Sequence, residues 1–127
     1  SIPKIKNQVI VISQGTITDQ LSKIILDNFN FFEDKNIKYK LHPGEFESYK
    51  ESYFLDKLLK KENVELVTND NLYDLFASSE YQVGAYSTAI YEGIEFGLKT
   101  ILCSTLFSEY MEELIESGKV FMVLDER

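Results

Sequence analysis

The chain has 127 residues, of which 44% are hydrophobic and 27% are charged, and it carries a formal net charge of −8. This length and composition are typical of one globular domain and exclude a disordered chain. The acidic balance disfavours binding to nucleic acid or to an anionic membrane, because phosphate groups would be repelled.

Strand and helix patterns alternate along the first third of the chain. The apolar, β-branched run QVIVIS at residues 8–13 predicts a strand buried on both faces. Beyond it, apolar residues recur at helical spacing, and Thr16 is expected to be the N-cap of that helix. The alternating segment IKYKL, residues 37–41, predicts a second, more exposed strand.

A helix is predicted after His42-Pro43-Gly44. Ser48 and Glu51 have the spacing of a capping box. The buried stripe of the helix is predicted to consist of four apolar residues: Phe54, Leu55, Leu58 and Leu59.

The alternation continues to the end of the chain. Four further strands are predicted, at residues 64–67, 81–86, 100–103 and 120–123. Three helices are predicted between them, at residues 69–79, 87–96 and 108–118, with Gly118 as the C-cap of the last. Six β/α units in alternation predict an α/β fold, a doubly wound parallel six-stranded sheet of Rossmann-like or flavodoxin-like type with helices on both faces.

In open parallel sheets, ligands bind beyond the carboxyl ends of the strands, so the strand-to-helix loops are the places to look for a site. The first such loop is Ser13-Gln14-Gly15-Thr16. Gly15 allows the backbone to approach a ligand, and the helix that follows offers free N–H groups. A tight turn followed by an N-cap explains the same residues.

The second loop contains the only histidine, His42. Pro43 biases the preceding residue towards extended backbone, so we expect His42 to lie on the last pleat of its strand. Its imidazole could bind a phosphate oxygen, or donate a proton to that oxygen as it leaves. The alternative is a surface histidine before a turn.

The third loop opens the predicted helix 87–96. Ser87 and Thr88 follow a strand directly, so their hydroxyls and the N–H groups of the helix converge on one point. Glu92 lies one turn deeper on the same face as Thr88, where a carboxylate suits a pair of sugar hydroxyls. The alternative is a capped helix with a surface glutamate. With a Rossmann-like strand order, all three loops meet at one crevice.

Two motifs, LHPGE at residues 41–45 and YSTAIYEGIEFGLKTIL at residues 86–102, resemble the C-terminal nucleotide-binding domain of GT-B-type glycosyltransferases. The ordered His-Pro and Ser-Thr pair is similar to that of bacterial sialyltransferases and polysialyltransferases, which use CMP-sialic acid. Similar pairs occur in CDP-glycerol glycerophosphotransferases of teichoic-acid and capsule synthesis. The resemblance implies a donor-binding domain for surface-polysaccharide synthesis that uses a CMP-linked sugar, with CDP-glycerol as the alternative donor.

The resemblance also implies roles for individual residues. His42 would contact the donor phosphate and help to protonate the leaving nucleotide. The other phosphate-binding residues would be Gly15, Thr16, Gly44, Ser87 and Thr88. Glu92 and Pro43 would contact the ribose or base. The only arginine is Arg127 at the end of the chain, which fits a single-phosphate donor better than a diphosphate.

GT-B enzymes have two domains with the active site between them, so the resemblance implies that this chain is the C-terminal half of a longer enzyme. Its N-terminal domain would supply the general base, and this half alone would bind nucleotide weakly. We expect no cofactor and no metal site, because one histidine and one cysteine leave only carboxylates as ligands. A non-catalytic nucleotide-binding or interaction module remains the alternative from another functional class.

The single cysteine, Cys103, excludes an intrachain disulfide and favours a reducing compartment. It lies on a predicted buried strand, where packing is its expected role. No apolar run approaches the roughly 20 residues that span a bilayer. We therefore expect a cytoplasmic domain without a transmembrane segment.

Overall fold

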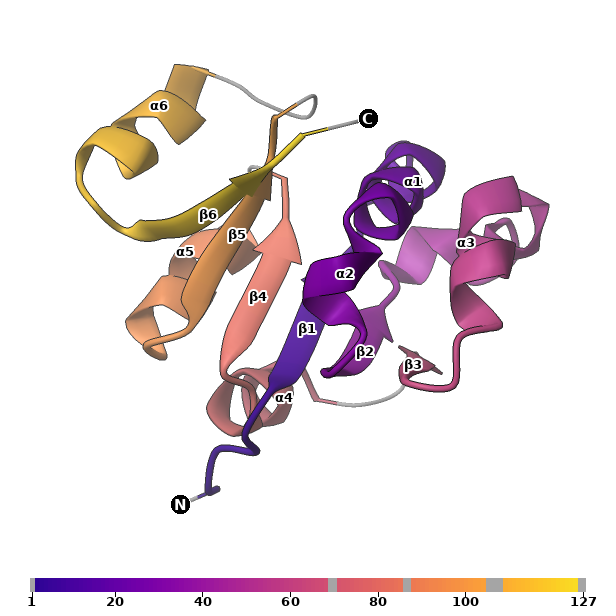
Figure 1. The fold of residues 1–127 in the computed structure, drawn as a ribbon, viewed down its shortest axis with the longest axis horizontal. Helices are drawn as coiled ribbons and strands as arrows, with labels where there is room; N and C mark the ends of the chain where they lie inside the picture. Colours follow the sequence, from indigo (N-terminus) through magenta and orange to yellow (C-terminus); the bar gives the residue numbers. More distant parts are fainter. Residues whose placement is uncertain (1, 69–70, 86–87, 105–108, 126–127) are drawn as a thin grey trace.

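The structure is a computed structural model that describes residues 2–68, 71–85, 88–104 and 109–125, with side chains for all of these except 109–111. Within these residues it forms one sheet with helices on both sides (Figure 1).

The sheet has six strands, all parallel, in the order β3-β2-β1-β4-β5-β6. The strands are β1 (Gln8–Ile12), β2 (Asn36–Lys40), β3 (Val64–Val67), β4 (Tyr81–Gly84), β5 (Lys99–Cys103) and β6 (Val120–Leu124). The chain runs outwards from β1 to β3 and then returns to the other side of β1. This arrangement confirms the predicted doubly wound, Rossmann-like fold and selects the Rossmann-like strand order over the flavodoxin-like one.

In the part of the chain that the structure describes, α-helices and short 3₁₀ helices connect the strands. They are α1 (Thr18–Asp27), α2 (Phe29–Phe32), η1 (Pro43–Glu45), η2 (Tyr49–Glu51), α3 (Tyr53–Leu59), α4 (Leu72–Ser78), α5 (Thr88–Glu95) and α6 (Glu109–Glu116). Helices α1, α2 and α3 pack on one face of the sheet, and α4, α5 and α6 pack on the other (Figure 1).

Strand β1 lies at the centre of the sheet, and all five of its residues are buried. Its side chains alternate between two hydrophobic clusters. Val9 and Val11 pack with α1 and α3 on one face, whereas Ile10 and Ile12 pack with α4 and α5 on the other. This two-sided burial explains why the strand reads as a continuous apolar run in the sequence.

The starts of two helices differ from the predictions. Thr16 is not the N-cap of α1: the cap residue is Ile17, and no side chain caps this helix. Ser48 and Glu51 do not form a capping box: Ser48 is the N-cap of the η2 turn and makes no side-chain capping hydrogen bond, and Glu51 is the last residue of that turn. Ser52 caps α3 instead, accepting a hydrogen bond from the N–H of Leu55 at 3.1 Å.

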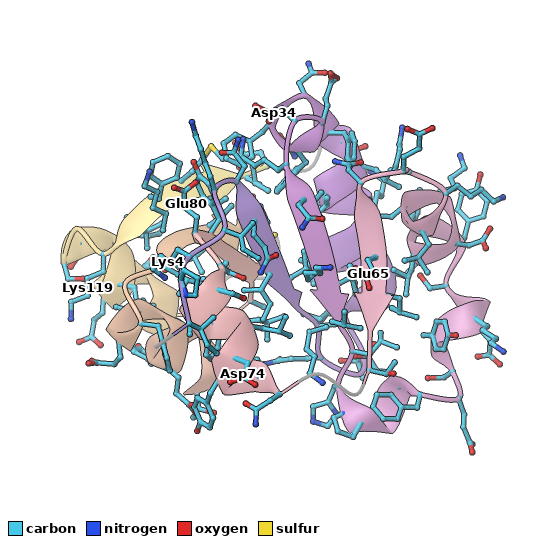
Figure 2. The ribbon with its side chains drawn as sticks, turned by 90° about the horizontal axis from the view of Figure 1, so that it is seen from below. Lys4, Asp34, Glu65, Asp74, Glu80 and Lys119 are labelled. Carbon is cyan, nitrogen blue, oxygen red and sulfur yellow. The ribbon has the colours of Figure 1, made fainter. Side chains whose placement is uncertain are left out.

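The segment before β1 packs against the end of α4. The N–H of Ile5 donates to the carbonyl of Ser78, and Nζ of Lys4 donates to the carbonyl of Ser79. The N–H of Asn7 donates to the Glu80 carboxylate (Figure 2 labels Lys4 and Glu80). These contacts lie at the amino ends of the strands, away from the strand-to-helix loops.

Candidate functional site

The strand order brings the three loops singled out in the sequence to one edge of the sheet. Strand β1 pairs with β2 on one side and with β4 on the other. The loops after these three strands are therefore neighbours at the carboxyl edge. The chain leaves β1 towards one face of the sheet and leaves β4 towards the other, so the switch point of the fold lies between β1 and β4.

Gly84 holds the two strands and α5 close together at this point. It is the last residue of β4 and pairs with Ile12, the last residue of β1. A Cβ atom at Gly84 would lie 3.2 Å from the carbonyl oxygen of Ile12 and 3.2 Å from Cδ1 of Ile90 on α5. A larger residue would therefore require these neighbouring atoms to shift by a few tenths of an ångström.

Contrary to the prediction, His42 does not lie on the last pleat of its strand: β2 ends at Lys40, and His42 is the N-cap of the η1 turn that follows. Its backbone is extended, with φ −71° and ψ 142°, as expected for a residue before proline. Its Nδ1 accepts a hydrogen bond of 3.1 Å from the N–H of Gly44. The side chain of Glu45 accepts a hydrogen bond of 3.1 Å from the N–H of His42, which completes a capping box. The histidine is thus held at both its backbone and its ring.

Glu45 is buried, with 1% of its surface exposed. One carboxylate oxygen accepts from the N–H of His42, and the other accepts a 3.2 Å hydrogen bond from Oγ of Ser13 at the end of β1. Ser13 is 2.9 Å from the hydroxyl of Thr18, the first residue of α1. Glu45 therefore joins the ends of β2, β1 and α1.

The polar cluster continues beneath the start of α1. The hydroxyl of Tyr39 lies 2.9 Å from Oγ of Ser22 and donates weakly to the carbonyl of Thr18 at 3.4 Å. Burial raises the pKa of Tyr39 well above its ordinary value, although hydrogen bonds from Ser22 and Ser13 oppose this. Tyr39 therefore acts as a neutral hydroxyl at neutral pH, and the only carboxylate in this buried cluster is that of Glu45.

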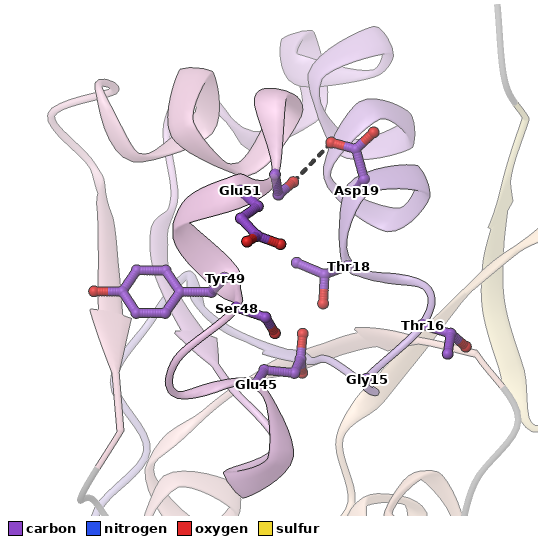
Figure 3. A pocket seen from close by; sticks show the side chains of 9 residues that line it. Gly15, Thr16, Thr18, Asp19, Glu45, Ser48, Tyr49 and Glu51 are labelled. Carbon is purple, nitrogen blue, oxygen red and sulfur yellow. Dashed lines mark hydrogen bonds between the residues drawn. The ribbon is translucent and has the colours of Figure 1, made fainter.

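A pocket of about 320 Å³ opens above this cluster, between α1 and the η2 turn (Figure 3). It is lined by Gly15, Thr16, Thr18, Asp19, Glu45, Ser48, Tyr49, Glu51 and Ser52. In Figure 3 the side chains of Thr18, Glu45 and Ser48 converge, whereas the ring of Tyr49 points away.

The pocket is acidic. Asp19, Glu45 and Glu51 contribute three carboxylates, and none of the described lining residues is basic. Hydroxyl groups make up most of the remaining polar lining. Such a lining repels a phosphate group and favours neutral hydroxyl groups or an amine.

A larger pocket of about 530 Å³ lies between the far end of α1 and α3. Its lining is Leu26, Asp27, Phe54, Lys57, Lys60 and Lys61. Helix α1 starts at the carboxyl edge of the sheet and reaches this pocket only at its C-terminal end, so none of the three loops contributes to it.

The structure places the predicted site residues in three neighbouring groups. Gly15 and Thr16 line the acidic pocket and are exposed. His42, Pro43 and Gly44 form the exposed η1 turn beside it but are not among its lining residues. The other group is on α5, where Thr88 is exposed at the first position and Ser87 lies outside the described residues.

Glu92 is half-buried on α5, and its partner is Tyr73 of α4. The hydrogen bond between the two side chains, and then the charge of Glu92, raise the pKa of Tyr73. Glu92 thus interacts with Tyr73 on the face of the sheet that α4 and α5 cover. The acidic pocket lies on the opposite face, which α1 and α3 cover.

No functional role was predicted from the sequence for Thr18, Asp19 and Glu45, and Ser13 was named only as part of the loop 13–16. A signal for Glu45 was available, because it follows His42 by three residues, which is the capping-box spacing. The contacts of Ser13 and Thr18 with Glu45 depend on the pairing of β1 with β2, which local spacing does not reveal.

Among the described residues, no group of three or more histidine, cysteine, aspartate or glutamate side chains is arranged to hold a metal ion. Within the same part of the chain, every helix is too short or too polar to cross a membrane.

The sequence matches no protein-family model and no curated protein. Two solved structures of the UDP-GlcNAc 2-epimerase from Methanocaldococcus jannaschii resemble this chain. For one of them the TM-score is 0.68 at 18% identity, and the match covers 91% of this chain and 34% of the epimerase chain. The other is a complex with UDP-GlcNAc and UDP. Its TM-score is 0.69 at 16% identity, and the match covers 99% of this chain and 36% of the epimerase chain.

The C-terminal CMP-Kdo binding domain of WaaA from Acinetobacter baumannii is also similar. Its TM-score is 0.59 at 15% identity, and the match covers 92% of this chain and 74% of that one. The chain spans about a third of the length of the epimerase chains. At these identities the likeness is one of fold alone.

Proposed function

We propose that this chain is the donor-binding domain of a glycosyltransferase that acts in surface-polysaccharide synthesis, and that it binds a nucleotide-activated sugar at the carboxyl edge of β2, β1 and β4. The observation that carries the proposal is the position of His42. The capping box with Glu45 fixes this histidine at the end of β2, next to the loop after β1 and one strand from the switch point.

The charges at the edge separate two kinds of binding surface. A donor phosphate is repelled by the three carboxylates of the pocket that Gly15 and Thr16 line. The start of α5 offers the hydroxyl of Thr88 and the positive end of the helix dipole, which suit an anion. We therefore place the phosphate between His42 and the start of α5, where an N–H of His42 would donate a hydrogen bond to the leaving oxygen and stabilise its developing charge.

The acidic pocket then suits the polyhydroxylated part of the donor. Carboxylates and hydroxyls form hydrogen bonds with sugar hydroxyl groups without requiring a counter-charge. Asp19 and Glu51 are exposed at its rim. On this proposal a second domain supplies the general base that activates the acceptor, and this domain alone binds donor without turnover.

We favour a cytidine nucleotide, because the His-Pro and Ser-Thr motifs resemble those of enzymes that use CMP-linked or CDP-linked donors. The similar domain of WaaA binds CMP-Kdo, whereas one of the similar epimerase structures is a complex with UDP-GlcNAc and UDP. A uridine donor is therefore the comparison that the binding experiment must include. Transfer of glycerophosphate from CDP-glycerol is the second candidate reaction, because CDP-glycerol glycerophosphotransferases have similar His-Pro and Ser-Thr pairs.

The test is ligand-observed NMR with CMP, CDP, UMP and UDP at several millimolar. A single domain should bind with a Kd near the millimolar range, about −4 kcal/mol. The informative variants are His42→Ala and His42→Asn. Asparagine can still accept the hydrogen bond from Gly44 N–H, so it retains the cap while removing the imidazole. Loss of binding in both variants supports a direct contact, and binding of no nucleotide by the wild-type chain rejects the proposal.

A further inference from the structure

We propose that Glu45 is a positioning residue for His42: it fixes the histidine so that the ring presents its Nε2–H to the ligand. The inference rests on the proposed function, because it names how the phosphate-binding histidine of that site is oriented. Two contacts carry it, one to the ring of His42 and one to its backbone.

The contact to the ring selects the tautomer. Nδ1 of His42 accepts a hydrogen bond from Gly44 N–H, so this nitrogen carries a lone pair and no proton. In a neutral ring the proton is then on Nε2. Among the residues that the structure describes, none hydrogen-bonds to Nε2, and His42 is exposed. The free donor is therefore available to an external acceptor such as a phosphate oxygen.

The contact to the backbone holds the turn that makes the ring contact possible. Gly44 reaches Nδ1 only while residues 42–45 form the η1 turn. Glu45 closes this turn by accepting from His42 N–H, and it anchors the turn to β1 through Ser13. Without the carboxylate, the N–H of His42 loses its partner and the turn loses its link to the central strand.

Burial makes Glu45 more suitable for this task than a surface carboxylate. At 1% exposure it is shielded from water, so its hydrogen bonds are not exchanged with solvent as those of an exposed group are. Its anchor is also rigid, because Ser13 is 3% exposed and is itself bonded to Thr18 at 2.9 Å. The geometry of the sheet edge is thus transmitted to the histidine ring.

The experiment uses the whole 127-residue chain labelled with ¹⁵N, and it reads the ring directly. His42 is the only histidine, so its two ring nitrogens are the only imidazole signals in a long-range ¹H–¹⁵N correlation spectrum. The variants are Glu45→Ala and Glu45→Gln, with Glu47→Ala as the matched control, because Glu47 is an exposed carboxylate in the same segment. Each variant is also titrated with CMP.

The wild-type ring should be the Nε2–H tautomer, and Glu45→Ala should convert it to a mixture of tautomers and shift the amide signal of Gly44. Glu45→Gln should restore both signals, because its amide oxygen can accept from His42 N–H while its NH₂ group donates to Ser13. The affinity for CMP should fall about tenfold in Glu45→Ala, as expected for loss of one charge-assisted hydrogen bond. The double variant, His42→Ala with Glu45→Ala, should bind CMP as weakly as His42→Ala alone and no more weakly.

An unchanged ring tautomer in folded Glu45→Ala overturns the inference, whether or not any nucleotide binds. Normal CMP affinity in that variant, with CMP binding by the wild-type chain intact, overturns it as well and leaves the proposed function standing. If the wild-type chain binds no nucleotide, the proposed function fails, and the tautomer measurement still decides whether Glu45 orients the ring. Should Glu45→Ala not fold, an Nδ1–H ring in the wild-type chain is the result that contradicts the inference.

Discussion

The side chain of Gln82 occupies the space that a side chain at position 93 would need. A Cβ atom placed on Gly93 would lie 2.0 Å from Oε1 of Gln82. Gln82 cannot easily move, because its Nε2 donates to the carbonyl of Ile90 and to the hydroxyl of Thr100, both at 2.9 Å. This contact between β4 and α5 sets how closely the helix approaches the sheet beside the switch point.

Gly93→Ala should therefore destabilise the domain by about 1–3 kcal/mol, the usual cost of overpacking a core. Gly15→Ala is the control, because no atom lies within 4 Å of the corresponding Cβ position. Urea unfolding measures both variants. In a Gln82→Ala background the same Gly93→Ala change should cost clearly less, since the obstructing atoms are gone. Equal costs in the two backgrounds would show that the clash is not the cause.

Asp19 connects α1 to the start of α3. Its Oδ1 accepts hydrogen bonds from Oγ of Ser52 at 2.7 Å and from the N–H of Phe54 at 2.9 Å. Asp19→Ala should cost about 1 kcal/mol of unfolding free energy, as loss of a helix cap does. Asp19→Asn keeps the accepting oxygen and should cost less than half as much.

The control for this prediction is Asp56→Ala, which removes an exposed carboxylate that pairs with Lys60 at 3.3 Å on α3. Such surface pairs contribute little, so its effect on thermal unfolding should be under about 0.5 kcal/mol. If Asp19→Ala lowers the unfolding free energy no more than Asp56→Ala does, the hydrogen bonds that link α1 to α3 do not stabilise the domain.

The domain should lose stability at alkaline pH. Burial raises the pKa of Cys103 from 9.0 to about 12, and burial also raises that of Tyr39. Above pH 9 the unfolded chain releases the thiol proton while the folded chain retains it. The unfolding free energy therefore falls as the pH rises from 9 towards 12, by about 1 kcal/mol per pH unit for one such group.

In Cys103→Ala the unfolding free energy should fall less steeply with pH, by about 1 kcal/mol per pH unit, because the thiol is gone. Tyr39→Phe should also reduce the slope, because it removes the buried hydroxyl. The measurement is urea unfolding at several pH values between 8 and 11. Identical pH slopes for the wild-type chain and Cys103→Ala would contradict the assignment. The buried thiol, with 0% exposure, should also react with a thiol reagent only after unfolding.

The fold could be predicted because each buried strand can be recognised from its own run of apolar residues. QVIVI and TILC are apolar over their whole length, or nearly so, as strands covered on both faces must be. The short helix α2, FNFF, was not predicted, because four residues are too few to show a helical period. The N-cap of α3 was predicted at Ser48, four residues before the observed cap, Ser52. Both serines precede the apolar residues of the helix, so the local sequence does not separate them. The hydrogen bond between Ser52 and Asp19 of α1 favours Ser52.

The candidate site could be predicted only in part. His42, Gly15 and Thr88 were proposed as site residues, because Pro43, a glycine and a helix start mark their loops in the sequence. Glu45 was missed, because its main anchor is Ser13, 32 residues away in the chain. The acidity of the pocket also depends on Asp19, Glu45 and Glu51, which come from two separate parts of the chain brought together by the β1–β2 pairing.

On the proposed function, a nucleotide binds at the carboxyl edge of β2, β1 and β4. The most direct test maps the backbone amide signals of the ¹⁵N-labelled chain during a titration with CMP. We expect concerted, saturable shifts at Gly15, His42, Gly44 and Thr88, with smaller shifts in the His42→Asn variant. Shifts confined to the lysine-lined pocket between α1 and α3, or no shifts at several millimolar CMP, would contradict it.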